Sequence, residues 1–417
     1  MIGSLEHDNA IGVRSMRKNQ MILLSVLAVI NLLNYVDRIS LSLLLEPIKQ
    51  ELLLSDGQMG LLSGVAFSLF YALLGIPIAR IADRGGKAWL LPLCVFLWSL
   101  MTMASGFATS FVALFLARML VGVGEAGCSP TSFSIIAENF EPQRRPVAIS
   151  IFQAGGLLGV ALGMMAAGFA AEALGWRMAM ILVGAAGVPI AILAWLILRG
   201  IAEERRPEVH NSAFKDIGQL LAQKPFRSIV FGISFAAFGS YSVLQWLPAF
   251  FMRVHQLPIG QVGLLMALST GGGGIVGMLG GGFGSRHLLA RDVRWDLRLP
   301  AITYAISAPL FLSMLLTSNT SLAIVLNFAA TAVSASGGGI ALAALQRFTG
   351  EGRRATANAV MLMVSAVFGV GFGPLFVGYA SDFAAPYLGT GSLRLALALS
   401  TLSFVLAALN FMRAARN

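Results

Sequence analysis

Four ionisable residues lie inside long apolar runs of this sequence. Asp37 and Arg38 belong to the first such run, and Arg118 and Glu125 belong to the fourth. A charged side chain at the centre of a membrane-spanning helix costs roughly 2.5 to 3.5 kcal/mol on insertion scales. Charges kept at that cost indicate a buried site for an ion, a proton or a substrate.

The spacing of these residues predicts that they meet. Arg118 and Glu125 are seven positions apart, so they share one face of a helix. Counting about 1.5 Å per residue from the predicted ends of the runs places Asp37 and Arg118 in the same half of the hydrocarbon core. Two interpretations stay open: an Asp37–Arg118 ion pair that only fixes two helices, or a working site whose acids and bases exchange partners.

Proton coupling is the chemistry that two buried acids beside two arginines suggest. Burial favours the protonated form of a carboxyl group, and a nearby guanidinium favours the ionised form. A movement that changes the contact therefore changes the affinity for a proton. We predict Asp37 and Glu125 as the coupling acids and favour Glu125, because Asp37 has Arg38 beside it and Arg118 at similar depth.

The composition predicts an all-α integral membrane protein. Of 417 residues, 57% are hydrophobic and only 12% are charged, which lies outside the range of soluble domains. Apolar stretches long enough to span a bilayer number twelve, so both ends of the chain lie on one side. The predicted spans are roughly 21–45, 58–80, 89–109, 111–136, 147–171, 177–198, 226–251, 259–284, 299–317, 321–346, 355–380 and 392–412.

The basic residues predict which side that is. Most of the 29 Lys and Arg residues fall in the two tails and in the even-numbered loops, so both termini are expected in the cytoplasm. The net charge of +10 is mainly this topology signal. It does not indicate nucleic-acid binding, because no compact basic face with interleaved aromatic residues accompanies it. Short loops suggest a multi-pass protein of a bacterial inner membrane.

Two repeated sequence motifs predict an internal duplication. Residues 57–62 read Gly-Gln-Met-Gly-Leu-Leu at the start of span 2, and residues 260–265 read Gly-Gln-Val-Gly-Leu-Leu at the start of span 8. A Phe followed by an Arg-Arg pair recurs after spans 4 and 10. We therefore predict two parallel six-helix halves, 1–198 and 226–417, joined by a cytoplasmic linker over 199–225. In such folds the substrate site lies between the repeats.

Other classes of function find no support. Cys94 and Cys128 both fall inside predicted spans, and no disulfide framework or metal-ligand spacing is present. An enzyme would need a nucleophile or a metal set, and none of those signatures occurs, so we predict neither an enzyme nor a cofactor. A channel is the remaining rival. The duplicated halves and the closed cluster of charges favour alternating access over a continuous pore.

Three segments resemble a known family. They are Asn-Tyr-Val-Asp-Arg at 34–38, Asp-Arg-Gly-Gly-Lys at 83–87, and Arg-x-x-x-Gly-x-Gly-Glu at 118–125. Together they resemble the major facilitator superfamily across essentially the whole chain. The combination looks most like its spinster family of lysolipid and sphingolipid transporters.

That resemblance implies a twelve-helix fold and a cytoplasmic gate. The gate residues it implies are Asp83, Arg84 and Lys87. Ala79 stands where this loop motif usually has Gly, and the second-half copy lacks the acid, so only the first-half gate is expected.

The resemblance also implies the substrate class. It indicates a single-chain, proton-coupled carrier of a lysophospholipid or sphingolipid phosphate, working as a monomer in the lipid bilayer. The alternatives within the superfamily are an organic-anion/proton symporter and a drug/proton antiporter.

The predicted substrate-binding residues combine charge with aromatic surface. Arg38 and Arg118 offer forked donors for phosphate or carboxylate. Tyr35 in span 1 and Tyr241 and Trp246 in span 7 supply aromatic surface for an apolar group. Packing and contact with lipid explain the aromatic residues of span 7 equally well.

Overall fold

The computed structural model describes residues 18–200, 213–349 and 353–416, and helices are the only regular elements in these ranges. Long apolar stretches form helices here because a helix satisfies its own backbone hydrogen bonds without water. The first bundle contains α1 (Lys18–Leu52), α2 (Asp56–Ser63), α3 (Val65–Ile81), the π-helical segment η1 (Ala82–Gly86), α4 (Lys87–Ser105), α5 (Phe111–Glu125), α6 (Cys128–Asn139) and α7 (Arg145–Leu198).

The second bundle follows the short helix α8 (Ala213–Ala222). Its α-helices are α9 (Lys224–Val254), α10 (Ile259–Met266), α11 (Gly272–Arg291), α12 (Trp295–Leu316), α13 (Thr320–Thr349), α14 (Arg354–Val364), α15 (Phe372–Leu388) and α16 (Ser392–Arg416). Two π-helical segments, η2 (Ala267–Gly271) and η4 (Ser365–Gly371), and the 3-10 turn η5 (Gly389–Gly391) join some of them.

Ten helical segments of the described chain are long and apolar enough to cross a membrane. Two of them are longer than a single membrane crossing requires: α7 has 54 residues, and the segment Thr356–Arg416 has 61. Each contains a glycine with a positive φ, Gly175 at 80° and Gly389 at 52°. The multi-pass helical fold is confirmed. The count of twelve spans remains a prediction that requires two crossings from each long segment.

Helix α7 folds back on itself at Gly175. Ala148 and Leu198, near its two ends, belong to the same buried cluster. Trp176, beside the turn, belongs to a different one. The backbone of Gly175 has φ 80° and ψ 164°, a conformation open almost only to glycine. The turn in α7 therefore requires a glycine at position 175.

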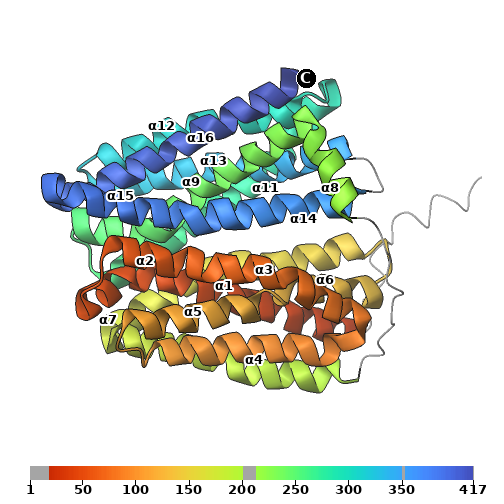
Figure 1. The fold of residues 1–417 in the computed structure, drawn as a ribbon, viewed down its shortest axis with the longest axis horizontal. Coiled ribbons are helices and arrows are strands. Elements are labelled where there is room, and N and C mark those ends of the chain that lie inside the picture. Colours follow the sequence, from red (N-terminus) through yellow and green to blue (C-terminus); the bar gives the residue numbers. More distant parts are fainter. Residues whose placement is uncertain (1–17, 201–212, 350–352, 417) are drawn as a thin grey trace, which may run out of the picture.

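The two bundles lie side by side, with α1 to α7 in one and α9 to α16 in the other (Figure 1). At one end of the molecule, α2 packs on α15 and α10 packs on α7. We call this end, where α1 leads into α2 and α9 leads into α10, the distal face. The helix α8 lies at the opposite end. The division of the chain into halves that end at 198 and begin at 226 remains a prediction.

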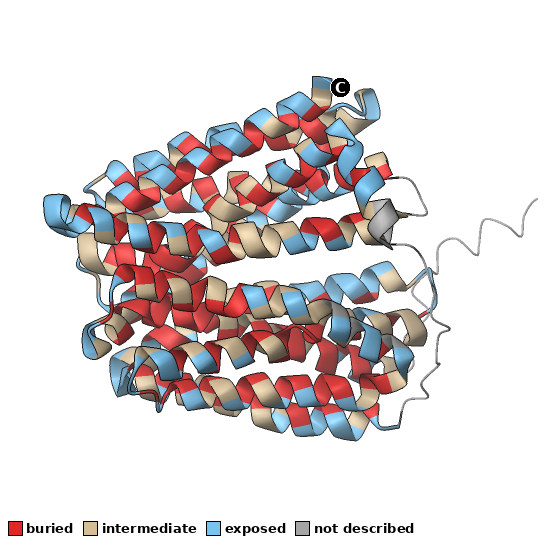
Figure 2. Cartoon of the chain, viewed as in Figure 1, coloured by how far each residue is buried: buried red, intermediate tan, exposed pale blue. Residues whose placement is uncertain are grey.

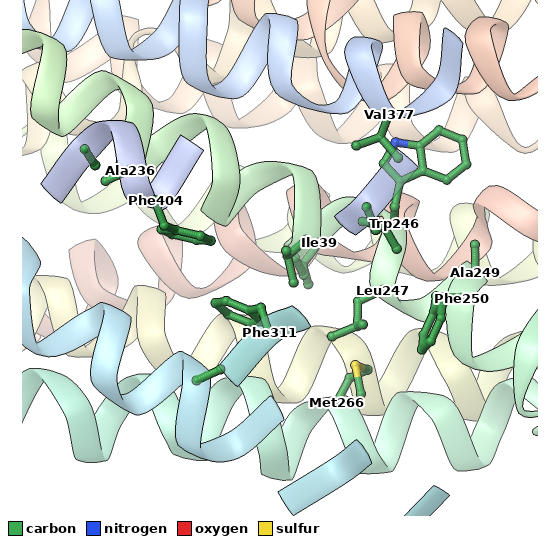
Figure 3. Close-up of a cluster of buried hydrophobic side chains, with 14 of the residues drawn as sticks. Ile39, Ala236, Trp246, Leu247, Ala249, Phe250, Met266, Phe311, Val377 and Phe404 are labelled. Carbon is green, nitrogen blue, oxygen red and sulfur yellow. The ribbon is translucent and has the colours of Figure 1, made fainter. Parts of the chain in front are cut away.

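Buried side chains line the inner sides of both bundles and gather where the bundles meet toward the distal face (Figure 2). Ile39 of α1 lies among side chains of the second bundle, including Leu247 and Phe311 (Figure 3). One apolar cluster therefore extends across both bundles. It holds them together without a strand or a disulfide in the described ranges.

Two ion pairs in matching places fit the predicted duplication. Lys87 of α4 pairs with Glu138 of α6, 51 positions later. Asp296 of α12 pairs with Arg347 of α13, also 51 positions later, at 2.7 Å. The signs of the charges are reversed between the bundles. An exchanged pair keeps the attraction between the two helices, so the contact survives although the residues differ.

Candidate functional site

The four intramembrane charges form one cluster within the first bundle. Arg38 of α1 donates to Glu125 Oε2 of α5 from Nη2 at 2.7 Å and from Nε at 3.1 Å. Arg118 of α5 approaches Asp37 Oδ1 at 3.4 Å. Thr102 of α4 donates its hydroxyl to Asp37 Oδ2. Helices α1, α4 and α5 therefore meet around two linked ion pairs.

Burial distinguishes one member of the cluster. The side chains of Glu125, Arg118 and Asp37 are 0%, 2% and 4% exposed, whereas that of Arg38 is 14% exposed. Buried charges are stable only when they are paired and hydrogen-bonded. Arg38 is therefore the most exposed charge of the cluster.

Aromatic rings surround the Arg38 guanidinium. Its Cζ atom lies 4.8 Å from the ring centre of Phe67 and 5.3 Å from those of Tyr35 and Tyr71. A cation over an aromatic face gains electrostatic attraction, and the gain is larger when water is excluded. The rings hold the guanidinium in place while its Nε and Nη2 atoms bind Glu125.

Several buried polar atoms of the cluster have no hydrogen-bond partner. They are Asn34 Nδ2, Arg118 Nε and Glu125 Oε1. Asn34 accepts a long hydrogen bond from Arg38 through its Oδ1 atom, at 3.4 Å. Unsatisfied buried polar atoms are costly and are a common feature of functional sites. The cluster thus has spare donors and acceptors for a change of partner.

The predicted assignment of partners needs one correction. Arg38 follows Asp37 in sequence, and from that adjacency we expected Arg38 to keep Asp37 ionised. In the structure the close partner of Arg38 is Glu125 instead, because consecutive helical residues point about 100° apart. The Asp37–Arg118 contact does form, although it is the longer one.

The predicted aromatic residues lie in different surroundings. The Tyr35 ring centre lies 5.3 Å from the Arg38 Cζ atom, whereas Tyr241 of α9 is half-buried, and its role in substrate binding remains a prediction. Trp246 is fully buried, and its indole N–H donates to the Pro374 carbonyl at 2.9 Å. In this conformation Trp246 packs α9 against α15, so a role in substrate binding remains a prediction.

The structure describes only part of the predicted cytoplasmic gate. The side chain of Asp83 lies outside the described residues, and Arg84 is exposed in η1. Lys87 is buried and pairs with Glu138 of the same bundle. The gate assignment of all three residues remains a prediction.

Sequence reasoning missed three members of the site. Phe67 and Tyr71 of α3 flank Arg38, and Thr102 of α4 binds Asp37. The spacing of Phe67 and Tyr71, four apart in a span, was a visible sign of a shared aromatic face. Thr102 gave no such signal, because single threonines are common in membrane helices.

An apolar cavity of about 380 Å³ is lined mainly by helices of the second bundle, with Val160 of α7 at its edge. Helix α9 borders both this cavity and the first bundle, since it packs against α1 and its Ser240 and Leu244 line the cavity. The other walls include Val160, Tyr304, Phe311 and Thr331. Charge and apolar surface are therefore separated onto the two bundles. No metal-binding group of His, Cys, Asp or Glu occurs among the described residues.

Comparison with known proteins gives concordant results. Residues 27–374 match the family described as Major Facilitator Superfamily. An MFS-type efflux pump of Mycolicibacterium smegmatis is 35% identical over 376 residues, covering 90% of this chain and 87% of the pump. A probable L-galactonate transporter of Escherichia coli (strain K12) is 29% identical over 271 residues, covering 61% of this chain and 59% of that protein.

A solved structure is similar over nearly the whole fold. It is the crystal structure of a bacterial homolog to the human lysosomal transporter spinster, in an inward-facing and unoccupied conformation. The two chains are 28% identical and superpose with a TM-score of 0.85, covering 96% of this chain and 98% of the other.

Proposed function

The chain belongs to the major facilitator superfamily and is a transporter, and we propose that it carries an amphipathic anion, such as a lysophospholipid or a sphingolipid phosphate, in a proton-coupled cycle. The observation that carries the proposal is Arg38, the most exposed charge of an otherwise buried cluster. It is held between aromatic rings and paired with an acid that can release it.

The division of the interior between the bundles supports an amphipathic substrate. Arg38 can bind a phosphate through its fork of N–H donors. On the other side of α9, the apolar cavity offers room for part of a hydrocarbon chain. A substrate with an anionic head and an apolar tail would use both surfaces, and removing the tail from water would stabilise the complex.

Proton coupling follows from competition for Arg38. A substrate anion that binds Arg38 takes the donors that now bind Glu125 Oε2. Glu125 is fully buried, and an unpaired carboxylate in such a place is more stable with a proton. Binding of the anion would thus load a proton, and its release would return Arg38 to Glu125.

Asp37 would have a different role. Each of its oxygens already has a partner, Arg118 on one and Thr102 on the other. This contact would fix α1 against α4 and α5 while Glu125 changes state. Asp37 would take part in coupling only if Arg118 also moves.

Transport into proteoliposomes tests the proposal. Labelled lysophospholipid should accumulate in response to an imposed pH step, and Arg38→Lys should lower uptake at least tenfold because lysine keeps the charge but loses the fork. Arg199→Lys is the matched control, because Arg199 lies over the Trp195 ring at the end of α7, away from the charged cluster. Uptake that is equal in wild type and Arg38→Lys would contradict the role of Arg38.

The second candidate is an organic-anion/proton symporter. It is favoured by the charged cluster taken alone, which needs no apolar tail, and by the L-galactonate transporter among the relatives. Calorimetry in detergent separates the two: lysophospholipid should bind more tightly than a hexuronate. Tighter binding of the hexuronate would replace the lipid proposal. If neither anion binds, a drug/proton antiporter becomes the favoured function, and the efflux pump among the relatives supports it.

We further propose a bacterial inner membrane location with both termini in the cytoplasm, which makes the distal face the outer one. The supporting observation is the distribution of Lys and Arg between the loops. A cysteine at exposed Leu53 should react with a membrane-impermeant maleimide in intact cells. Reaction only after lysis would reverse the orientation.

A further inference from the structure

An uncharged polar network lies beside the apolar cavity of the second bundle. Its centre is Asn327 of α13, which is fully buried. The Nδ2 atom of Asn327 donates to Ser269 Oγ at 2.8 Å and to Thr270 Oγ1 at 3.0 Å. Its Oδ1 atom accepts from Thr331 Oγ1 at 3.5 Å. The proposed exchange at Arg38 makes no use of these residues.

Close packing of α11 on α13 brings Asn327 within reach of η2. A Cβ atom added to Gly273 would lie 2.8 Å from the Phe328 carbonyl oxygen. Gly277 and Gly281 repeat this contact with carbonyl oxygens of α13 on the next two turns. Small residues at this spacing let two helix backbones approach closely. The amide of one short side chain can therefore bridge the two helices.

Two members of the network also line the cavity. They are Thr270 and Thr331, whereas the fully buried Asn327 lies behind them. Thr270 belongs to the π-helical segment η2, and such segments within α-helices are frequent at functional sites. Thr331 follows Asn327 by one helical turn, so both lie on the same face of α13. The cavity wall thus carries two hydroxyl groups that a buried amide holds in position.

The hydroxyl hydrogens of both threonines have only weak acceptors. Thr270 Oγ1 donates to Met266 Sδ at 3.8 Å, and a thioether sulfur is a weak acceptor. Thr331 Oγ1 reaches Asn327 Oδ1 only at 3.5 Å, which is long for a hydrogen bond. A hydroxyl group in the cavity can accept from one threonine and donate to the other, whereas a carbonyl oxygen can only accept. The pair therefore suits a hydroxyl group best.

The two threonines lie on the side of the cavity that adjoins the first bundle. The segment η2 packs on α7, where a Cβ atom added to Gly271 would lie 3.1 Å from that of Ala161. Val160 of α7 also lines the cavity, and its apolar walls come from α9 and α12. A group bound at Thr270 therefore lies between these apolar walls and the bundle that contains Arg38. This is the place of a polar group that joins an anionic head to an apolar tail.

We propose that Thr270 and Thr331 form a subsite for a hydroxyl group of the substrate, and that Asn327 is the residue that positions them. The inference rests on the proposed function, since lysophospholipids and sphingolipid phosphates carry a hydroxyl group between the phosphate and the tail. A site that hydrogen-bonds a hydroxyl group rejects an analogue without it, because the polar atoms of the site then lose a partner. The two threonines therefore determine specificity among anions that the apolar walls alone do not distinguish.

Two ligands that differ in one hydroxyl group test the subsite: oleoyl glycerol phosphate and its deoxy analogue, oleoyl propanediol phosphate. Calorimetry in detergent should show that wild type binds the hydroxyl compound roughly five- to tenfold more tightly. Thr270→Val and Thr331→Val should each bring this ratio toward one, because valine keeps the shape and removes the hydroxyl group. Thr270→Ser should preserve the ratio. Thr303→Val is the matched control, since Thr303 donates to the Pro300 carbonyl within α12 and lies outside the cavity wall.

Asn327→Leu tests positioning. Leucine has a similar size but no amide, so the ratio should fall although the side chain at 327 does not line the cavity. Melting temperatures and size-exclusion profiles show whether each variant is folded. An unchanged ratio in folded Asn327→Leu would exclude its positioning role.

The remaining outcomes separate the subsite from the proposed function. A wild-type ratio in folded Thr270→Val and Thr331→Val would overturn the subsite, as would an equal fall in Thr303→Val. Equal binding of the two ligands to wild type, weakened in Arg38→Lys, would overturn the subsite alone. Binding of neither ligand would overturn the proposed function and the subsite with it.

Discussion

At the scale of single residues, Arg38 is the position on which the account depends. It is the least buried charge of the cluster, and it binds Glu125 through two donors. Both donors go to one oxygen, Oε2, so an anion that takes them removes the whole contact between Arg38 and Glu125.

Glu125→Gln tests coupling at this scale. The variant should abolish accumulation driven by a pH step, because glutamine cannot take up a proton, yet it should leave exchange of labelled for unlabelled substrate measurable. Both are measured in the same proteoliposomes. Accumulation that still follows the pH step would rule out coupling through Glu125.

Asp37→Asn should harm both activities and the fold. It leaves Arg118 buried without an opposite charge, which typically costs about 3 to 5 kcal/mol. We expect a lower melting temperature and loss of both accumulation and exchange. Asp292→Asn is the control, since its pair with Arg298 is about half exposed. Normal melting of Asp37→Asn would mean that the Asp37–Arg118 contact contributes little.

The sequence was sufficient to find these charges but not to pair them. Hydropathy alone identifies Asp37, Arg38, Arg118 and Glu125, because each interrupts an apolar run. Their partners depend on helix rotation and on neighbours from other helices. Thr102 of α4 and the aromatic pair Phe67 and Tyr71 of α3 belong to the site because their helices pack around the charged residues, and hydropathy does not show that packing.

At the scale of elements, the turn in α7 shows what an apolar pattern cannot reveal. Spans 5 and 6 were predicted as separate runs, but their joint is a single glycine and no polar loop. The same pattern could not show that α9 packs against α1 and also lines the apolar cavity. Adjacent residues of one helix face different spaces, and only packing decides which.

Gly175→Ala tests the turn. A side chain at φ 80° and ψ 164° is strained, and such strain costs about 1 to 3 kcal/mol. The melting temperature should fall, whereas Gly280→Ala, in a helix with open space around the glycine, should leave it nearly unchanged. An unaltered melting temperature for Gly175→Ala would show that the turn is not restricted to glycine.

At the scale of the whole molecule, the halves meet through an apolar core and a set of ions at the distal face. The repeated glycine segments could be read from the sequence, but their packing partners could not, because the segments of α7 and α15 that they contact carry no shared motif. Backbone approach depends on the absence of side chains on one helix and on carbonyl positions on the other. Neither the pairing of the helices nor the carbonyl positions can be read from a single sequence.

The central claim is that the substrate anion takes Arg38 from Glu125 and so loads a proton. Proton uptake on binding tests it most directly, by adding lysophospholipid to the purified protein in weakly buffered detergent with a pH-sensitive dye. Wild type should take up close to one proton per substrate bound, and Glu125→Gln should bind substrate without uptake. Binding to wild type with no proton uptake, or equal uptake by Glu125→Gln, would contradict the account.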